Sequence, residues 1–128
     1  RTYHGSAMGL AVQAASVAAW SDETHVRANR ALYREKFEAA VGILRKVAPV
    51  EMPQAGFYLW LRTPGDDAQF ARGLFETYNV TVLPGSFLAR DAHGINPGRG
   101  FVRVALVPAP GECLEGARRL AEFYTRFA

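Results

Sequence analysis

FVRVALV, residues 101–107, is the stretch that decides the fold, because its β-branched and apolar residues predict a strand with one charge at its centre. Side chains alternate along a strand, so Arg103 shares one face with Phe101 and Ala105, while the neighbouring valines occupy the other face. A guanidinium keeps its proton and is costly to bury without an anion. The strand therefore predicts an anionic partner for Arg103.

Two kinds of partner for Arg103 are open. An acid of the chain, such as Asp66 or Asp67, would form an internal salt bridge with a structural role. A ligand carboxylate is the alternative, because the planar guanidinium can donate two parallel hydrogen bonds to it. The first partner predicts a purely structural or interaction domain, and the second predicts a stand-alone or integrated binding site for a small carboxylate.

Three helices are predicted around this strand. Apolar residues at three-, four- and seven-residue steps predict a helix over about 21–47, with Ser21 as its N-cap. A second helix is predicted from a cap at Asp66 to a C-cap at Asn79, and a third from Pro110 onward. Each has an apolar stripe that must face a common core.

The remaining segments predict short strands. Residues 50–52 are expected to be extended, the aromatic-rich run 57–61 to be a strand buried on both faces, and residues 80–83 to be a strand that ends at a proline. A glycine-rich loop of about fifteen residues follows, over 85–100. The order of elements predicts an α+β fold, a small mixed or antiparallel sheet covered by helices.

The N-terminal segment differs from the rest of the chain. Residues 7–20 predict a helix that is apolar on all sides, and such a helix must be covered on all sides. We therefore expect residues 1–20 to form an interdomain or interface segment and residues 21–128 to form the domain. Because the chain begins with Arg1 and has no initiator methionine, we expect it to be a piece of a longer protein.

Composition excludes several classes of protein. The chain has 128 residues, 49% hydrophobic and 21% charged, which suits one globular domain rather than a disordered segment. The net charge of +3 is spread along the chain, so nucleic acid is not expected as a partner. A membrane span is not expected either. The single cysteine, Cys113, is expected to pack in a helix, and its isolation favours the reducing cytoplasm.

No complete catalytic apparatus is expected within the chain. His4, His25 and His93 are far apart and lack the spacing of metal ligands, so no metal site is expected. Lys36 and Lys46 are the two lysines, and the helical periodicity places both in solvent. Neither position predicts the buried amine that Schiff-base chemistry requires.

Three segments carry a resemblance to a known family: QAGFYLW at 54–60, NVTVLPGSF at 79–87 and FVRVAL at 101–106. In this order they resemble the C-terminal part of the class I/II, fold-type I aminotransferases, and the resemblance covers essentially the whole chain. The run LPGSFLARDAHG at 83–94, followed by Asn96-Pro97-Gly98, is most similar to the N-succinyldiaminopimelate aminotransferases of bacterial lysine biosynthesis.

The resemblance implies roles for three residues. Arg103 would bind the α-carboxylate of amino-acid and 2-oxo-acid substrates. Arg1 and Tyr3 fall where related enzymes have a loop that reaches the neighbouring subunit, so they would contact the side-chain carboxylate of glutamate or a succinyl group across a homodimer interface. The expected acceptor is N-succinyl-2-amino-6-oxopimelate, with glutamate as the amino donor.

The resemblance also implies what lies elsewhere. In this family pyridoxal 5'-phosphate supplies the chemistry, and its lysine and phosphate-binding residues belong to an N-terminal large domain. No catalytic or cofactor-binding residue is therefore assigned to this chain. We expect the chain alone to be inactive and to bind no cofactor.

Overall fold

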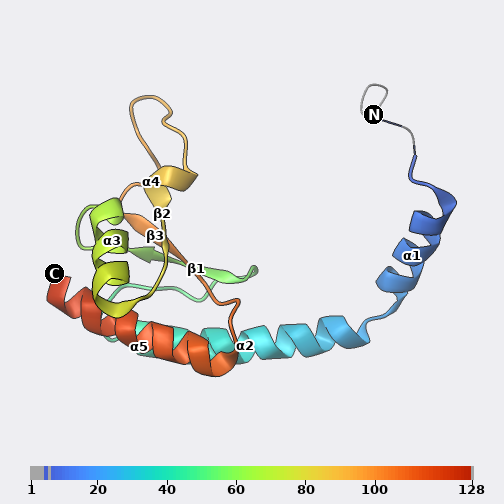
Figure 1. Ribbon diagram of the computed structural model, residues 1–128, viewed down its shortest axis with the longest axis horizontal. Coiled ribbons are helices and arrows are strands. Elements are labelled where there is room, and N and C mark those ends of the chain that lie inside the picture. Colours follow the sequence, from blue (N-terminus) through green and yellow to red (C-terminus); the bar gives the residue numbers. More distant parts are fainter. Residues whose placement is uncertain (1–4, 6, 128) are drawn as a thin grey trace. The chain divides into compact units, whose positions relative to one another are not determined.

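The computed structural model describes residue 5 and residues 7–127 of the chain. Contacts divide the chain into two compact units, Arg1–Ala31 and Leu32–Ala128, and each is considered by itself. The elements follow the chain as labelled in Figure 1: α1 (Leu10–Ser21), α2 (Thr24–Leu44), β1 (Tyr58–Arg62), α3 (Asp67–Tyr78), β2 (Leu83–Pro84), α4 (Gly85–Leu88), β3 (Phe101–Ala105) and α5 (Pro110–Phe127).

Helix α1 belongs to the first unit and has no buried residue. It begins at Leu10, three positions later than the sequence predicts. It ends at Ser21, so the prediction that Ser21 caps the next helix is wrong. The cap is instead the carboxylate of Asp22, whose Oδ1 accepts the amide of Thr24 at 2.9 Å. An aspartate can satisfy a first-turn amide as well as a serine can, and here it lies closer to the turn.

The part of α2 in the second unit carries the predicted apolar stripe, with Phe37, Val41 and Leu44 buried. The prediction that Lys36 is solvated is wrong, since this side chain is 3% exposed. Its Nζ donates to the carbonyl oxygens of Leu106 at 3.1 Å and Val107 at 3.2 Å. Two carbonyl acceptors at the end of β3 satisfy the ammonium, which is why its burial is tolerated.

The second unit contains an antiparallel three-stranded sheet in the order β1-β3-β2. Strand β3 is central, and its Arg103 lies opposite Trp60 of β1 and Leu83 of β2. The ladder between β1 and β3 continues beyond both strands, through Leu106 N to Phe57 O and Thr63 N to Gly100 O, each at 2.9 Å. The predicted α+β class with a small antiparallel sheet is confirmed.

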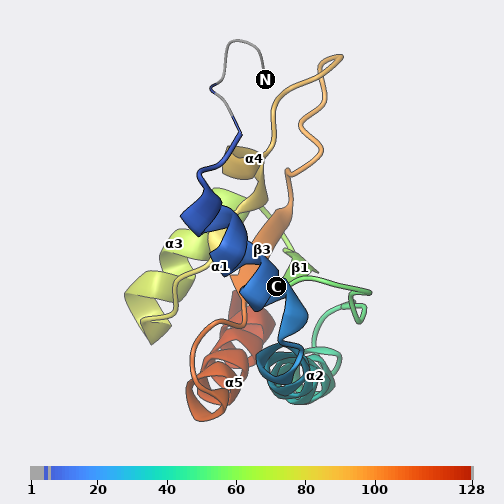
Figure 2. The ribbon, with the colours of Figure 1, turned by 90° about the vertical axis from the view of Figure 1, so that its right-hand side faces the viewer.

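Helices cover one face of this sheet. Figure 2 looks nearly along α2 and α5, which lie on the same side of the strands. Phe70 of α3 packs edge-on against Phe123 of α5 at a ring separation of 5.1 Å. The core between helices and sheet includes these fully buried side chains: Leu44, Leu59, Leu61, Phe70, Leu74, Val102 and Leu120. Apolar burial of this kind is the main stabilising term of the unit.

Three predicted helix ends are confirmed. The side chain of Asp66 accepts the amide of Gln69 at 2.8 Å and caps α3. Asn79 ends the same helix in the left-handed conformation, with φ 52° and ψ 42°, which asparagine tolerates better than most residues. Helix α5 begins at Pro110, where a missing amide proton costs nothing.

The predicted strands were less accurate. Residues 50–52 form no strand, although Val50 is buried, and the ladder in the 80–83 region is limited to Leu83 and Pro84. The expectation that 57–61 is buried on both faces is wrong, because exposure alternates along β1 and only Leu59 and Leu61 are enclosed. Aromatic residues fit a bare sheet face as well as a covered one, so the local pattern does not reveal which is present.

The loop predicted over 85–100 begins with the short helix α4. Within residues 7–127, no helix is long and apolar enough to cross a membrane.

Candidate substrate-binding face

The sheet face opposite the helices carries Arg103 at its centre. Alternation places Tyr58, Trp60 and Arg62 of β1 on this face, together with Phe101 on β3. Tyr58 and Trp60 remain 38% and 39% exposed. This surface, called the open face below, therefore brings two guanidinium groups and three aromatic rings together on one side of a rigid sheet.

Arg103 has no anion beside it. Within residues 7–127 the ion pairs involve other residues, and the Nε atom of Arg103 is buried without a hydrogen-bond partner. Its Cζ lies 5.6 Å from the ring centre of Tyr58, a cation–π contact that orients the group without neutralising it. A buried donor without an acceptor is costly, so the geometry fits a bound carboxylate.

The two acids considered as internal partners are engaged elsewhere. Asp66 caps α3, as described above. Asp67 is 1% exposed, and its carboxylate accepts the amide of Ser86 at 2.7 Å and, more weakly, the amide of Gly100 at 3.4 Å. Neither forms an ion pair with Arg103, so the salt bridge that would make this arginine structural is not formed by them.

Asp67 ties the start of α3 to both ends of the 85–100 loop. Burial by itself raises the pKa of this carboxyl, but hydrogen bonds from Ser86 and from the Gly100 amide outweigh burial, and the pKa of Asp67 lies below its ordinary value. The charged form is therefore the one that the fold stabilises. Since Gly100 directly precedes β3, the contact also fixes where the strand of Arg103 begins.

The loop is closed by a contact between glycines. A side chain at Gly85 would meet the carbonyl oxygen of Gly98, and a side chain at Gly98 would meet the backbone of Gly85. Asn96 reinforces this closure, donating to the carbonyl of Ser86 and accepting the amide of Gly98, each at 3.0 Å. The glycines of the LPGSF and NPG motifs are thus required for a close backbone approach.

One end of the open face is hollowed. A cavity of about 660 Å³ lies between residues 49–54 and the sheet, and it is lined by Trp60, Arg62 and Phe101 on the sheet side. The rings of Trp60 and Phe101 stack at 5.6 Å with an interplanar angle of 16°. The Cζ of Arg62 lies 5.1 Å from the centre of Phe101. The sequence patterns did not single out Arg62, because a charge at the end of a strand is usually a solvated edge residue.

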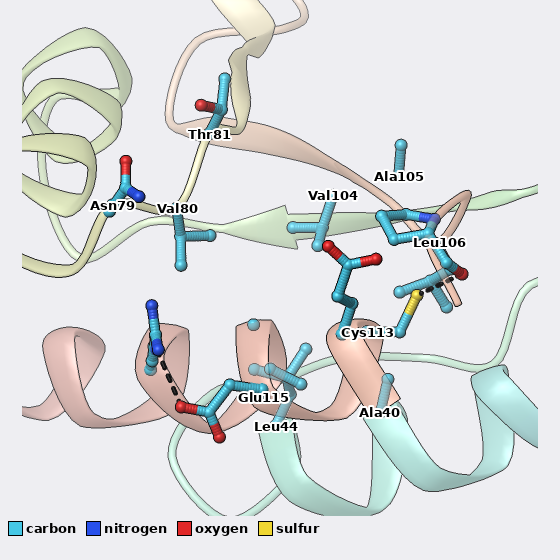
Figure 3. Close-up of a pocket in the computed structure, with 15 residues that line it drawn as sticks. Ala40, Leu44, Asn79, Val80, Thr81, Val104, Ala105, Leu106, Cys113 and Glu115 are labelled. Carbon is cyan, nitrogen blue, oxygen red and sulfur yellow. Dashed lines mark hydrogen bonds and ion pairs between the residues drawn. The ribbon is translucent and has the colours of Figure 1, made fainter. Parts of the chain in front are cut away.

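A second cavity, of about 490 Å³, lies on the other side of the sheet between β3, α5 and the segment after α3 (Figure 3). Two of its charged side chains pair with each other, since Arg119 Nε lies 2.9 Å from Glu115 Oε1. Cys113 also lines it, with Sγ 3.3 Å from the carbonyl of Pro108, and burial raises the pKa of the thiol. As predicted, Cys113 is a packing residue, and a thiolate is disfavoured there.

The other residues considered from sequence do not form a site. His25 lies 3.2 Å from Asp22, and His93 occupies an exposed position in the loop. In the described part of the chain, no group of three histidine, cysteine or acidic residues could hold a metal ion. Arg1, Tyr3 and His4 lie outside the described residues, so the roles inferred for Arg1 and Tyr3 stay predictions.

The lysines do not fit an aldehyde cofactor. Lys36 is enclosed between α2 and the end of β3 with its Nζ bound to two carbonyls, and Lys46 is exposed in the turn after α2. Neither amine lies in a polar pocket with free donors that could receive a phosphate. Neither lysine is therefore placed as an anchor for an aldehyde cofactor.

Arg103 thus forms no ion pair with the described residues and lies on the open face of a small α+β unit. The chain belongs to the aminotransferase class I and II family, whose model matches residues 4–120. The family membership predicted from the three sequence segments is confirmed.

Two solved structures resemble the chain over most of its length. An aminotransferase from Neisseria meningitidis Z2491 is 53% identical, with a TM-score of 0.90 over 97% of this chain and 32% of that one. A probable N-succinyldiaminopimelate aminotransferase from Thermus thermophilus is 36% identical, with a TM-score of 0.66 over 80% of this chain and 26% of that one.

Among curated proteins, the LL-diaminopimelate aminotransferase of Nitratidesulfovibrio vulgaris (strain Hildenborough) is 31% identical over 116 residues. The match covers 88% of this chain and 28% of that protein. The chain thus spans less than a third of the length of this relative.

Proposed function

We propose that the chain is the C-terminal small domain of a pyridoxal-phosphate-dependent aminotransferase and that it binds the α-carboxylate of the substrate through Arg103. The observation that carries this proposal is the buried Nε of Arg103, which has no acceptor among the described residues, on a sheet face that helices leave open. Family membership supplies the reaction class.

The cofactor is held by residues outside this chain. When bound, pyridoxal phosphate supplies the electron sink for transamination, and neither lysine of this chain is placed to anchor it. The contribution of this chain is binding and orientation. A bidentate bond from Arg103 fixes the α-carboxylate, and fixing a reactant in one orientation removes part of the entropic barrier.

The substrate that we propose is N-succinyl-2-amino-6-oxopimelate, with glutamate as the amino donor. Support comes from the solved structure named as a probable N-succinyldiaminopimelate aminotransferase and from the curated LL-diaminopimelate aminotransferase, since both names contain diaminopimelate, a long dicarboxylic amino acid. One clamp at Arg103 serves donor and acceptor, because both carry a carboxylate beside the reacting carbon.

The exposed apolar surface of α1 supports a proposal about partners. Leu10, Val17 and Trp20 are more than half exposed, and apolar side chains gathered on one helix need a covering surface. We propose that residues 1–20 contact the large domain or the second subunit of a homodimer, that residues 21–128 form the small domain, and that the enzyme is cytoplasmic.

The proposal is tested by Arg103→Lys in the full-length enzyme. Lysine keeps the charge but loses the two-pronged hydrogen bond, so the KM for glutamate and for the keto acid should each rise by about tenfold or more. Initial-rate kinetics measure both constants. The matched control is Arg72→Lys, at an exposed position of α3.

Unchanged KM values in Arg103→Lys would overturn the proposal that Arg103 binds the α-carboxylate. A second measurement uses the chain alone: mixed with pyridoxal phosphate and both substrates, it should produce no 2-oxoglutarate from glutamate. Transamination by the isolated chain would contradict the proposal that residues outside this chain hold the cofactor.

A further inference from the structure

Arg62 is a second cation on the open face. It lies opposite Phe101 in the register, so it is a diagonal neighbour of Arg103, with Cα atoms about 7–8 Å apart. The guanidinium of Arg103 lies over Tyr58, and that of Arg62 lies over Phe101. Trp60 lies opposite Arg103 and stacks on Phe101, so this ring pair adjoins both arginines.

Arg62 also lacks an anion. No carboxylate lies within 4.0 Å of it among the described residues. Glu51 lines the same 660 Å³ cavity without forming an ion pair with Arg62. Gln54 lines this cavity too and offers an amide. The cavity thus presents a guanidinium without an ion pair, an amide and two stacked aromatic rings, together with the carboxylate of Glu51.

The arrangement favours one class of ligand. Two separated guanidinium groups repel each other weakly across the face, and a molecule with a carboxylate at each end would satisfy both. Its middle section would lie across the Trp60–Phe101 stack, which offers apolar surface. A short dicarboxylate or a monocarboxylate would leave Arg62 without a partner.

We propose that Arg62 binds the distal carboxylate of a long-chain dicarboxylic substrate whose α-carboxylate is bound by Arg103. This inference rests on the proposed function, since it takes Arg103 as the clamp. It assigns to Arg62 and the adjoining cavity the selection of long dicarboxylates over monocarboxylates, with Trp60 and Phe101 setting the spacing between the two carboxylate sites.

The test uses two probes that differ in one carboxylate, pimelate and heptanoate, titrated into the 128-residue chain. Binding is followed by the fluorescence of Trp60 in a Trp20→Phe background, since these are the two tryptophans of the chain. Pimelate should bind about tenfold tighter than heptanoate, as expected for one additional charge-assisted pair. Arg62→Gln should remove this preference, and the control Arg72→Gln should retain it.

Equal affinities for the two probes, or a preference that survives Arg62→Gln, would overturn the role of Arg62. Circular dichroism of each variant shows whether the fold is retained, and Arg62→Lys, which keeps the charge, should preserve part of the preference. Arg103→Lys tests the role of Arg103 separately from that of Arg62, because it should weaken the binding of both probes equally. If heptanoate binding is unaffected by Arg103→Lys, the proposed function fails, whatever Arg62 does.

Discussion

The two faces of the sheet are built from the same strands yet have opposite surroundings. On the covered face, Leu59, Leu61 and Val102 are at most 1% exposed and pack beneath helices. On the open face, Trp60 and Arg103 occupy the neighbouring positions of the same strands and remain partly accessible. Stability is therefore concentrated on one side, and the groups capable of recognition are concentrated on the other.

This separation has a physical reason. A guanidinium without an anion on the covered face would lose its hydration without compensation. On the open face it keeps access to water or to a ligand while the sheet holds its backbone in place. The difference between the faces can be measured by making the same chemical change on each.

The largest effect is expected from Leu61→Ala on the covered face. Removing a fully buried leucine side chain costs about 2–5 kcal/mol of unfolding free energy, whereas Leu83→Ala on the open face should cost less than about 1 kcal/mol. Urea denaturation of both variants measures the difference. Equal losses would mean that the open face is covered in solution.

The next effect concerns the lysine that links α2 to the end of β3. Lys36→Met keeps the length of the side chain but loses the hydrogen bonds to Leu106 and Val107, and should cost about 1.5–3 kcal/mol. Lys46→Met, at an exposed position, should change stability by less than about 0.5 kcal/mol. If the two variants are equally stable, Lys36 is solvated after all.

A pH-dependent effect is expected from Asp67, which anchors the loop beside the open face. Its pKa is lower in the folded state than the ordinary value of about 3.9, so its charged form stabilises the fold above that pH, and the contribution is lost as pH falls through the folded pKa. Asp67→Asn should cost about 1–3 kcal/mol at neutral pH.

The measurement is the difference in unfolding free energy between wild type and Asp67→Asn from neutral pH down to about pH 3. This difference should shrink below about pH 4, because the Asp67 carboxyl of the unfolded chain takes up its proton first and that of the folded chain only at lower pH. Asp91→Asn, at an exposed loop position, serves as the control. A difference that stays constant with pH would contradict the assignment.

The smallest effect is expected from Glu51→Gln, beside Arg62 on the open face. Glu51 lines the cavity beside Arg62, so its charge opposes a carboxylate bound there. Glu51→Gln should tighten the binding of pimelate by about twofold to fivefold at low salt, since one nearby charge is worth less than about 1 kcal/mol at an exposed site. Titration of the chain measures this, and weaker binding would indicate that Glu51 assists the ligand.

Local sequence signals predicted much of the fold. The cap at Asp66, the left-handed Asn79 and the start at Pro110 depend on residues within one helical turn, so they can be read from short segments. The orientation of Arg103 also follows from strand alternation alone. Its position on the central strand does not, because strand order depends on contacts between distant segments.

The residues that sequence reasoning missed have hydrogen-bond partners that are distant in the sequence. Lys36 bonds to carbonyls 70 and 71 residues away, and Asp67 bonds to amides 19 and 33 residues away. A charged side chain is expected in solvent unless such partners are known. For Arg62, the informative facts were its register with Phe101 and the segment that forms the other wall of its cavity.

The contact between Gly85 and Gly98 closes the intervening segment into a loop whose two ends lie together. Figure 1 shows it extending beyond α4 before it returns to β3. The two ends of the loop are already in contact, so residues inserted at its tip, between His93 and Gly94, would lengthen the loop without moving the Gly85–Gly98 contact. The entropic cost of closing the loop grows only with the logarithm of its length. This tip is accordingly a place where an epitope or a fluorescent label could be grafted while the strand of Arg103 keeps its register.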